Sequence, residues 1–114
     1  IHSKLTKKNF SCYAASKSAL EALTRSLALE LSSNGISVNA IAPAAINTKM
    51  LKDGFANVPH KLKQLESYHP SGSIGTPEEL AVLVKSVTKQ KGSFLTGSIL
   101  DFNGGISSCL HDPG

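Results

Sequence analysis

The sequence of 114 residues predicts an α/β fold built on a parallel sheet. A long run of helix-forming residues is followed by a glycine stop and then by a short apolar run that ends at a proline. A second helix signal and a second short apolar run come later in the chain. A helix joined so closely to a strand is typical of the crossover units that connect parallel strands. A chain of this length holds at most one small domain.

The first helix is predicted over 13–33, after a polar loop over 1–12, because this stretch has no Gly or Pro and is rich in helix formers. One apolar stripe at helical spacing consists of Leu20, Leu23, Leu27 and Leu31. A second stripe on another side consists of Ala15, Ala19, Ala22 and Leu29. A helix that is apolar on two sides is expected to be buried on two sides. We therefore expect one side to cover a sheet and the other to meet a second helix, for example from another subunit.

The first strand is predicted over 36–42. It follows Asn34-Gly35, which stops the helix because Gly readily adopts the left-handed conformation. The run Ile-Ser-Val-Asn-Ala-Ile-Ala reads as a short buried strand, and Pro43 ends it. A helix, a turn and a strand in this order predict that the strand pairs in parallel with another one.

The segment 44–75 is predicted to be a loop and lid, with a short helix over 61–66, because Gly and Pro interrupt the rest. A connection this long in a compact domain is usually functional. A second helix is predicted over 76–88. Thr76 can cap it and Glu79 completes a capping box.

The last strand is predicted over 98–102, in the run Ser-Ile-Leu-Asp-Phe. The turn Asn103-Gly104-Gly105 ends it, and the tail to Gly114 is expected to be loose. The sequence contains no internal repeat and no low-complexity tract.

Composition and charge argue against several classes of protein. No apolar run approaches the roughly 20 residues that span a bilayer, so no membrane association is expected. The net charge is +4, but the Lys and Arg residues are scattered and the chain has 0 Trp, 2 Tyr and 4 Phe, so nucleic-acid binding is the last-ranked alternative. Cys12 and Cys109 have no neighbours at metal-ligand spacing, so we expect no metal site. Without a disulfide framework or a signal peptide, we expect a cytoplasmic location.

Tyr13 and Lys17 are the residues that point to chemistry. They stand four apart at the start of the first helix, which places both on one face. A neighbouring ammonium favours the phenolate and lowers the pKa of a tyrosine. Such a tyrosine can act as a proton donor or acceptor for a carbonyl and alcohol pair. The pair alone arises often by chance, so its sequence context decides its meaning.

That context resembles a known family. Tyr13-Ala14-Ala15-Ser16-Lys17 is similar to the Tyr-x-x-x-Lys active-site helix of the classical short-chain dehydrogenases/reductases. Three further blocks resemble that family in the same order, over 38–48, 73–81 and 95–105. Within them Ala44 stands where Gly is usual and Asn103 where Asp is common. The blocks together cover about Ser11 to Gly105.

The resemblance implies roles for individual residues. Tyr13 would be the general acid/base, and Lys17 would lower its pKa and bind the nicotinamide ribose. The backbone from Pro43 to Ile46 would meet the nicotinamide carboxamide, and Thr48 would support the cofactor. The implied cofactor-binding residues are Tyr13, Lys17, Pro43, Ala44, Ile46 and Thr48. The cofactor would be NAD or NADP, and 49–72 would form the substrate lid.

The resemblance also implies the fold, the C-terminal half of a doubly wound, Rossmann-like parallel sheet. The Gly-rich turn that binds the dinucleotide does not occur in the sequence, so we expect the N-terminal dinucleotide-binding half to be missing from this chain. The family's catalytic Ser would fall just ahead of Ile1. On its own, the chain is therefore expected to be inactive.

Two functions follow from these observations. The first is NAD(P)(H)-dependent reduction of a small-molecule carbonyl or oxidation of an alcohol. The alternative is a non-catalytic family member or fragment that acts in subunit assembly. In either case we expect a homodimer or homotetramer formed through helix 14–33 and the C-terminal helix and strand. The identity of the substrate cannot be read from the sequence.

Overall fold

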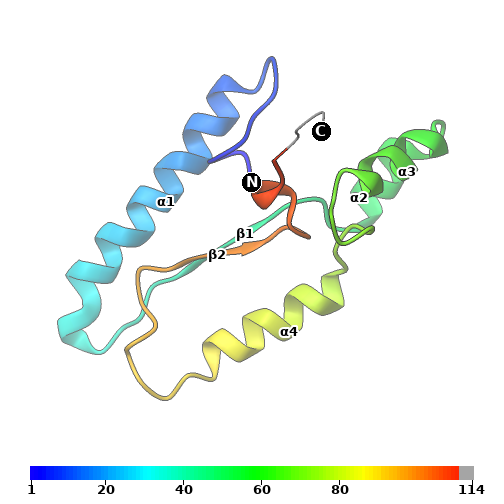
Figure 1. Ribbon diagram of the computed structural model, residues 1–114. Coiled ribbons are helices and arrows are strands. Elements are labelled where there is room, and N and C mark those ends of the chain that lie inside the picture. The colour runs from blue at the N-terminus through cyan, green and yellow to red at the C-terminus, as the bar shows by residue number, and fades with distance from the viewer. Residues whose placement is uncertain (111–114) are drawn as a thin grey trace.

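The computed structural model describes residues 1–110. Figure 1 shows two central strands lying between the helices α1 and α4, with α2 and α3 grouped beyond the carboxyl end of β1. The elements in chain order are α1 (Ser11–Leu31), the 3₁₀ turn η1 (Ser32–Asn34), β1 (Ala40–Pro43), α2 (Lys49–Phe55), α3 (Pro59–Ser67), α4 (Pro77–Thr88), β2 (Ile99–Phe102) and the 3₁₀ turn η2 (Ile106–Ser108).

The sheet of the described chain consists of β1 and β2, which pair in parallel. The register places Ala40 opposite Ile99 and Pro43 opposite Phe102. An isolated parallel bridge between Ile46 and Gly75 continues the pairing past the end of β1. The chain leaves β1, passes through α2, α3 and α4, and returns as β2, so the predicted parallel α/β arrangement is confirmed.

The first strand, β1, begins at Ala40 rather than at the predicted residue 36. Before Ala40, the side chain of Asn39 makes hydrogen bonds to the neighbouring segment in place of regular backbone pairing. Its amide nitrogen donates to the carbonyl oxygen of Leu95 at 2.9 Å, and its amide oxygen accepts from the Ser98 nitrogen at 3.1 Å. Gly97 has a φ of 72°, outside the range of a strand, so regular pairing begins only after it. The same irregularity moves the start of the second strand from residue 98 to 99.

Helix α1 begins two residues earlier than predicted and ends at Leu31, two residues before the predicted end at 33. The intervening residues form η1 instead, a tighter turn that often closes an α-helix. Gly35 follows with a φ of 72°, and its N–H donates to the Ser32 carbonyl. The predicted glycine stop is therefore confirmed.

Within the described chain α1 is buried on one side, and the expected contact of its other side with a second helix, for example from another subunit, stays a prediction. Its buried residues are Thr24 and Ala28, on the side that faces the strands. Leu20, Leu23 and Leu29 are 51%, 51% and 80% exposed. The physical reason is that the two short strands cover one side of the helix alone, and residues 1–10 contact only its N-terminal half, through Tyr13, Ser18 and Glu21.

The segment predicted as a loop and lid over 44–75 contains two helices. The predicted helix over 61–66 lies inside α3, and α2 was not expected. Thr48 caps α2, since its hydroxyl oxygen accepts from the Leu51 nitrogen at 3.3 Å. Gly54 lies within α2 and does not interrupt the helix. Pro59 occupies the first turn of α3, where its missing N–H removes no helical hydrogen bond.

Helix α4 carries the predicted capping box. The Thr76 hydroxyl oxygen accepts from the Glu79 nitrogen at 3.2 Å, and a Glu79 carboxylate oxygen accepts from the Thr76 nitrogen at 2.8 Å. Two backbone donors at the helix start are thereby satisfied. These hydrogen bonds, made by the Thr76 backbone and then by its side chain, lower the pKa of Glu79 below its ordinary value of 4.5.

Thr76→Ala is expected to destabilise the protein by about 1 kcal/mol, because the N-cap acceptor of α4 is lost. Thr88→Ala is the matched control, since this hydroxyl donates to the Lys85 carbonyl in the last turn of the same helix and caps nothing at its start. The measurement is the midpoint and slope of denaturant-induced unfolding. Equal losses in the two variants would contradict the capping argument.

The same box predicts a pH dependence. Because the folded-state pKa of Glu79 is lowered, its contribution is present above the unfolded value of 4.5 and is lost as the pH falls through the folded value. Glu79→Gln is therefore expected to cost stability at neutral pH and to cost less in acid. Unfolding curves at both pH values check this, and an equal cost at both would contradict it.

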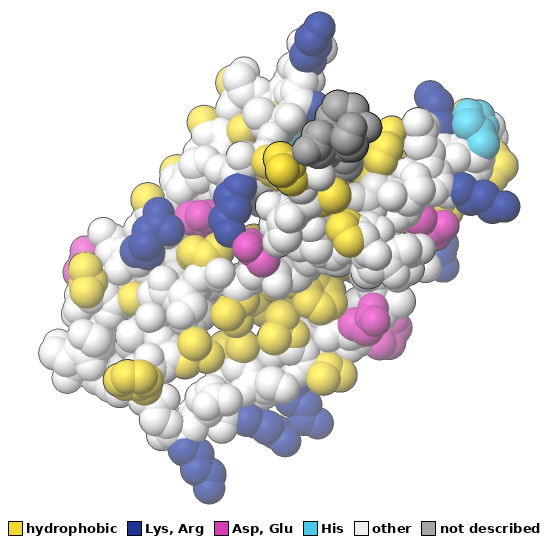
Figure 2. Space-filling view, in the orientation of Figure 1, with side chains coloured by type: hydrophobic (Ala, Val, Ile, Leu, Met, Phe, Trp, Pro, Cys, Tyr) yellow, Lys and Arg dark blue, Asp and Glu magenta, His cyan; other side chains and the backbone are white. Residues whose placement is uncertain are grey.

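The core of the described residues is small. Its buried apolar side chains are Ala28, Ala42 and Ile74, and its buried polar ones are Thr24, His69 and Asn103. In Figure 2 hydrophobic side chains gather between the strands and α4.

Asn103 shapes the turn after β2. Its oxygen accepts from the Gly105 nitrogen at 3.0 Å, and its amide donates to the Ser107 hydroxyl at 2.7 Å. Gly104 and Gly105 adopt φ values of 58° and 84°, so the predicted turn is confirmed. The tail predicted to be loose begins with η2, and its last four residues, 111–114, lie outside the described residues.

Candidate active site

Tyr13 and Lys17 come together on one face of the first turns of α1. The Lys17 Nζ atom lies 5.2 Å from the centroid of the Tyr13 ring, so the ammonium is in contact with the aromatic ring. Tyr13 is 48% exposed, which leaves its hydroxyl accessible to a ligand. The spacing of the two residues in the sequence thus produces the contact that was expected of it.

Two further rings surround Tyr13. His2 and Phe10 stack with centroids 4.9 Å apart, and each meets the Tyr13 ring edge-on, at 5.3 Å and 5.8 Å. Edge-to-face contacts of this kind favour one orientation of the tyrosine ring. The loop before α1 therefore positions the side chain that the helix presents.

A cavity of about 610 Å³ lies beside this pair and extends along β1. Tyr13, Lys17, Pro43 and Ala44 all line it. Its apolar wall comes from α2, α3 and η2 and includes Leu51, Phe55, Leu65 and Ile106. The cavity reaches the carboxyl end of a parallel strand, where open α/β sheets bind their ligands.

Ile46 and Thr48 do not line this cavity in the structure. Ile46 lies in the bridge to Gly75, where its side chain fills the space that a Cβ on Gly75 would need. Thr48 uses its hydroxyl to cap α2. Of the six cofactor-binding residues expected from the sequence, four share one cavity and these two lie just beyond it.

The backbone after β1 has one N–H group that is available to a ligand. The Gly75 nitrogen donates to the Ala45 carbonyl and the Asn47 nitrogen to the Gly75 carbonyl, so the Ile46 N–H points to the opposite side. Among the hydrogen bonds of residues 1–110, this N–H donates none. A carboxamide oxygen needs such a donor, and Lys17 adds three more for hydroxyl groups of a ribose.

The charge of the site is set by its lysines. Burial lowers the pKa of His2 below its ordinary value of 6.5, and the positive charges of the Ile1 amine and Lys7 lower it further. His2 is therefore neutral at pH 7. The lysines that line the cavity are Lys7 and Lys17.

Sequence reasoning missed His2, Phe10, Lys7 and His69, all of which surround the cavity or line it. The loop residues carry no periodic pattern, and their contacts with Tyr13 form only when the loop folds back. His69 is 4% exposed, and its Nδ1 lies 2.9 Å from the Leu65 carbonyl. Its position just before Pro70 at the end of a helix was the one available signal.

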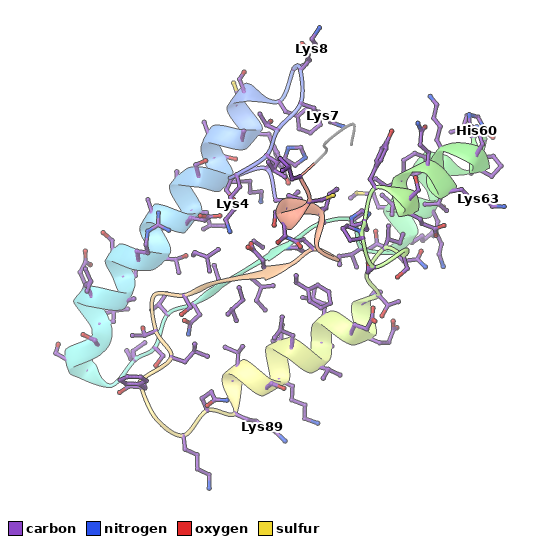
Figure 3. The ribbon with its side chains drawn as sticks, in the orientation of Figure 1. Lys4, Lys7, Lys8, His60, Lys63 and Lys89 are labelled. Atoms are coloured by element: carbon purple, nitrogen blue, oxygen red, sulfur yellow. The ribbon has the colours of Figure 1, made fainter. Side chains whose placement is uncertain are left out.

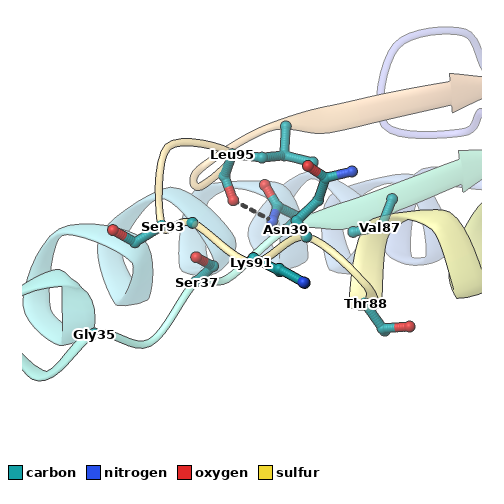
Figure 4. Close-up of a pocket in the computed structure, with 10 residues that line it drawn as sticks. Gly35, Ser37, Asn39, Val87, Thr88, Lys91, Ser93 and Leu95 are labelled. Atoms are coloured by element: carbon teal, nitrogen blue, oxygen red, sulfur yellow. Dashed lines mark hydrogen bonds between the residues drawn. The ribbon is translucent and has the colours of Figure 1, made fainter.

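A second hollow of about 660 Å³ lies at the opposite, amino end of the strands (Figure 4). Asn39, Lys91 and Ser93 line it, together with Gly35 and Thr88. The polar group in its wall with the most contacts, the Asn39 amide, is used to join the two strands. Within residues 1–110 the lining of this hollow includes no Asp, Glu, His, Cys or Tyr side chain, so the Tyr13 cavity is the candidate active site.

Other kinds of site have little support within residues 1–110. No group of three or more His, Cys, Asp and Glu side chains there could hold a metal ion. Over the same residues, no helix is both long enough and apolar enough to cross a membrane. Cys12 and Cys109 are free and exposed.

Comparison with known proteins shows which protein family the chain belongs to. Residues 1–107 match the family described as enoyl-(acyl carrier protein) reductase. A short-chain dehydrogenase family protein from Francisella tularensis superposes on 95% of the chain with a TM-score of 0.84 and 30% sequence identity. The chain belongs to the short-chain dehydrogenase/reductase family. Its two strands and their helices match part of the family's Rossmann fold.

Two other members of the short-chain dehydrogenase/reductase family indicate the range of this similarity. A 3beta-hydroxysteroid dehydrogenase from Eggerthella lenta is 37% identical over 107 residues, or 94% of this chain. A Pseudomonas aeruginosa structure described as an active-site complex with NADP is 35% identical, with a TM-score of 0.77 over 90% of this chain. The chain spans less than half the length of these three proteins, 48%, 41% and 40% respectively.

Proposed function

We propose that the protein carrying these residues is an NAD(P)(H)-dependent oxidoreductase that interconverts a small carbonyl compound and an alcohol. The observation that supports this most is the Lys17 ammonium at 5.2 Å from the Tyr13 ring, in the wall of a cavity at the end of β1. When bound, a nicotinamide cofactor supplies the hydride in the reducing direction and accepts it in the oxidising direction.

The residues of this chain handle the proton and the orientation. In reduction the Tyr13 hydroxyl donates its proton to the carbonyl oxygen, which becomes the hydroxyl of the product, and in oxidation the phenolate takes that proton back. The Lys17 ammonium lies beside the Tyr13 ring, and its N–H donors bind ribose hydroxyls. The Ile46 N–H, next to Pro43 and Ala44, binds the carboxamide, and Thr48 supports this turn by starting α2.

The substrate lid in this proposal is 49–72, which contains α2 and α3. Leu51, Phe55 and Leu65 give it an apolar inner surface, which excludes water from the reacting groups. NADP is present in a related structure, and we propose NAD or NADP here, since the residues that choose between them follow a strand outside this half of the fold. We place the protein in the cytoplasm, where two free cysteines stay reduced.

The test is ketone-dependent oxidation of NADPH and of NADH by the protein that carries these residues. We expect loss of the reduced nicotinamide absorbance when an aliphatic ketone is added, and no loss without it. If neither cofactor is consumed with a broad panel of ketones and aldehydes, the proposal fails.

Subunit assembly without catalysis is the second candidate. It is favoured by Leu20, Leu23 and Leu29, which the described chain leaves exposed on α1. We propose a homodimer or homotetramer formed through this helix and through α4 and β2. Sedimentation analysis separates the two candidates when combined with the cofactor assay, because an assembly without cofactor consumption favours this second function alone.

A further inference from the structure

Lys7 occupies a defined place beside the candidate active site. Its Nζ lies 4.2 Å from the centroid of the Phe10 ring, and the Phe10 ring lies 5.8 Å from the Tyr13 ring. The Phe10 ring thus lies in contact with both the Lys7 ammonium and the Tyr13 ring, which places Lys7 close to Tyr13. A cation held over an aromatic face keeps its N–H donors free for another partner. The contact thus fixes the ammonium at the cavity wall and leaves it able to bind an anion.

The charges around the cavity are unbalanced. Glu21 is its one acidic lining residue, and that carboxylate already accepts from the Ser3 hydroxyl and lies 3.8 Å from Arg25. Neither Lys7 nor Lys17 makes an ion pair within residues 1–110. Lys17 has a place in the proposed chemistry, which leaves Lys7 as a lysine at the cavity with no carboxylate partner in that part of the chain.

The wall of the cavity that α2, α3 and η2 build is apolar, with Leu51, Phe55 and Leu65 among its residues. Polar side chains elsewhere in the lining come from His2, Ser3 and His69. A ligand that satisfies both the cation and this wall has a carbon skeleton with an anionic oxygen group on it. Diffusing anions would also be drawn toward a cleft lined by positive charge.

We propose that this cavity selects carbonyl substrates that carry a carboxylate or phosphate, which Lys7 binds while Tyr13 faces the carbonyl oxygen. The inference rests on the proposed function and names the substrate class for it. The shared chemistry is an anionic oxygen group separated from the carbonyl by a short carbon chain. Lys7 is then a specificity-determining residue, and it takes no part in proton transfer.

The first experiment compares 4-oxopentanoate with its methyl ester, in which one added methyl group removes the negative charge. Lys7→Gln is expected to raise the KM for the acid about tenfold and to leave the KM for the ester and for the cofactor unchanged. Lys8→Gln is the matched control, because Lys8 is the adjacent lysine, does not line the cavity and extends outward from the tip of the loop in Figure 3. An equal effect of Lys7→Gln on acid and ester overturns the inference, and so does an effect of Lys8→Gln as large as that of Lys7→Gln.

A binding experiment separates this inference from the proposed function. Lysine amines of the 114-residue chain are labelled with ¹³C-methyl groups, and the Lys7 signal is assigned by its loss in Lys7→Gln. We expect it to shift with 4-oxopentanoate or with 4-oxopentyl phosphate and not with the methyl ester. The larger shift identifies the anion that the site prefers. A Lys7 signal that responds to neither anion overturns the inference even if ketones are reduced. A shift without ketone reduction supports the anion site while the proposed function fails.

Discussion

Tyr13→Phe is expected to lower the turnover number of the protein about 10²–10⁴-fold, because the proton donor to the carbonyl oxygen is removed. The ring itself remains, so its contacts with His2 and Phe10 and its packing beside Lys17 are kept. Cofactor binding is therefore expected to persist. The measurements are steady-state reduction of a ketone and a fluorescence titration with reduced cofactor.

Tyr68→Phe is the matched control for this variant. Tyr68, the other tyrosine of the chain, is 51% exposed and does not line the cavity, so removal of its hydroxyl should leave turnover unchanged. Near-normal turnover in Tyr13→Phe would remove Tyr13 from the chemistry. A loss of folding, detected by circular dichroism, is not expected from the removal of one exposed hydroxyl group.

Lys17→Gln is expected to lower turnover about 10²-fold and also to raise the KM for the cofactor, because the positive charge acts on Tyr13 and the N–H donors bind the ribose. Its effect should thus appear in both constants, whereas that of Tyr13→Phe should appear in turnover alone. Lys17→Arg keeps the charge and should recover part of the turnover. Steady-state kinetics with each substrate varied in turn provides both constants.

The control for Lys17 is Lys63→Gln, since Lys63 is exposed on α3 and lies apart from α1 in Figure 3. Both variants remove one positive charge from the protein, so a general electrostatic effect would appear equally in both. A loss of turnover in Lys17→Gln without any change in cofactor KM would contradict the proposed contact with the ribose.

The elements that the sequence predicts well are those with local signals. The capping box at Thr76, the glycine stop at Gly35 and the turn at Asn103 each depend on a few neighbouring residues, and each forms as expected. The strand bounds were less accurate, because Asn39 replaces backbone pairing with side-chain hydrogen bonds to residues almost 60 positions away in the sequence. Such partners cannot be found from spacing alone.

The candidate site divides in the same way. The contact between Tyr13 and Lys17 follows from helical spacing, which is visible in the sequence. The contacts of His2, Phe10 and Lys7 depend on a loop that folds back over the helix. No periodic pattern in the sequence predicts this fold of the loop.

The leucines of α1 show what a periodic pattern leaves open. Their spacing correctly indicates a helix, but burial depends on what else is present to cover it. Within the described chain Leu23 and Leu29 have no such cover, and the chain spans less than half the length of the relatives it matches. The pattern therefore predicts an amphipathic helix reliably and its partners poorly.

The central claim is that these residues place a carbonyl carbon where it receives a hydride while Tyr13 supplies the proton. The direct test is to reduce a ketone with NADPH deuterated at the transferring position, and to locate the deuterium in the product by mass spectrometry and NMR. We predict one deuterium on the carbinol carbon of the product. Tyr13→Phe should form this labelled alcohol only at its much lower residual rate. Alcohol without deuterium, or labelled alcohol formed equally fast by Tyr13→Phe, would contradict the account.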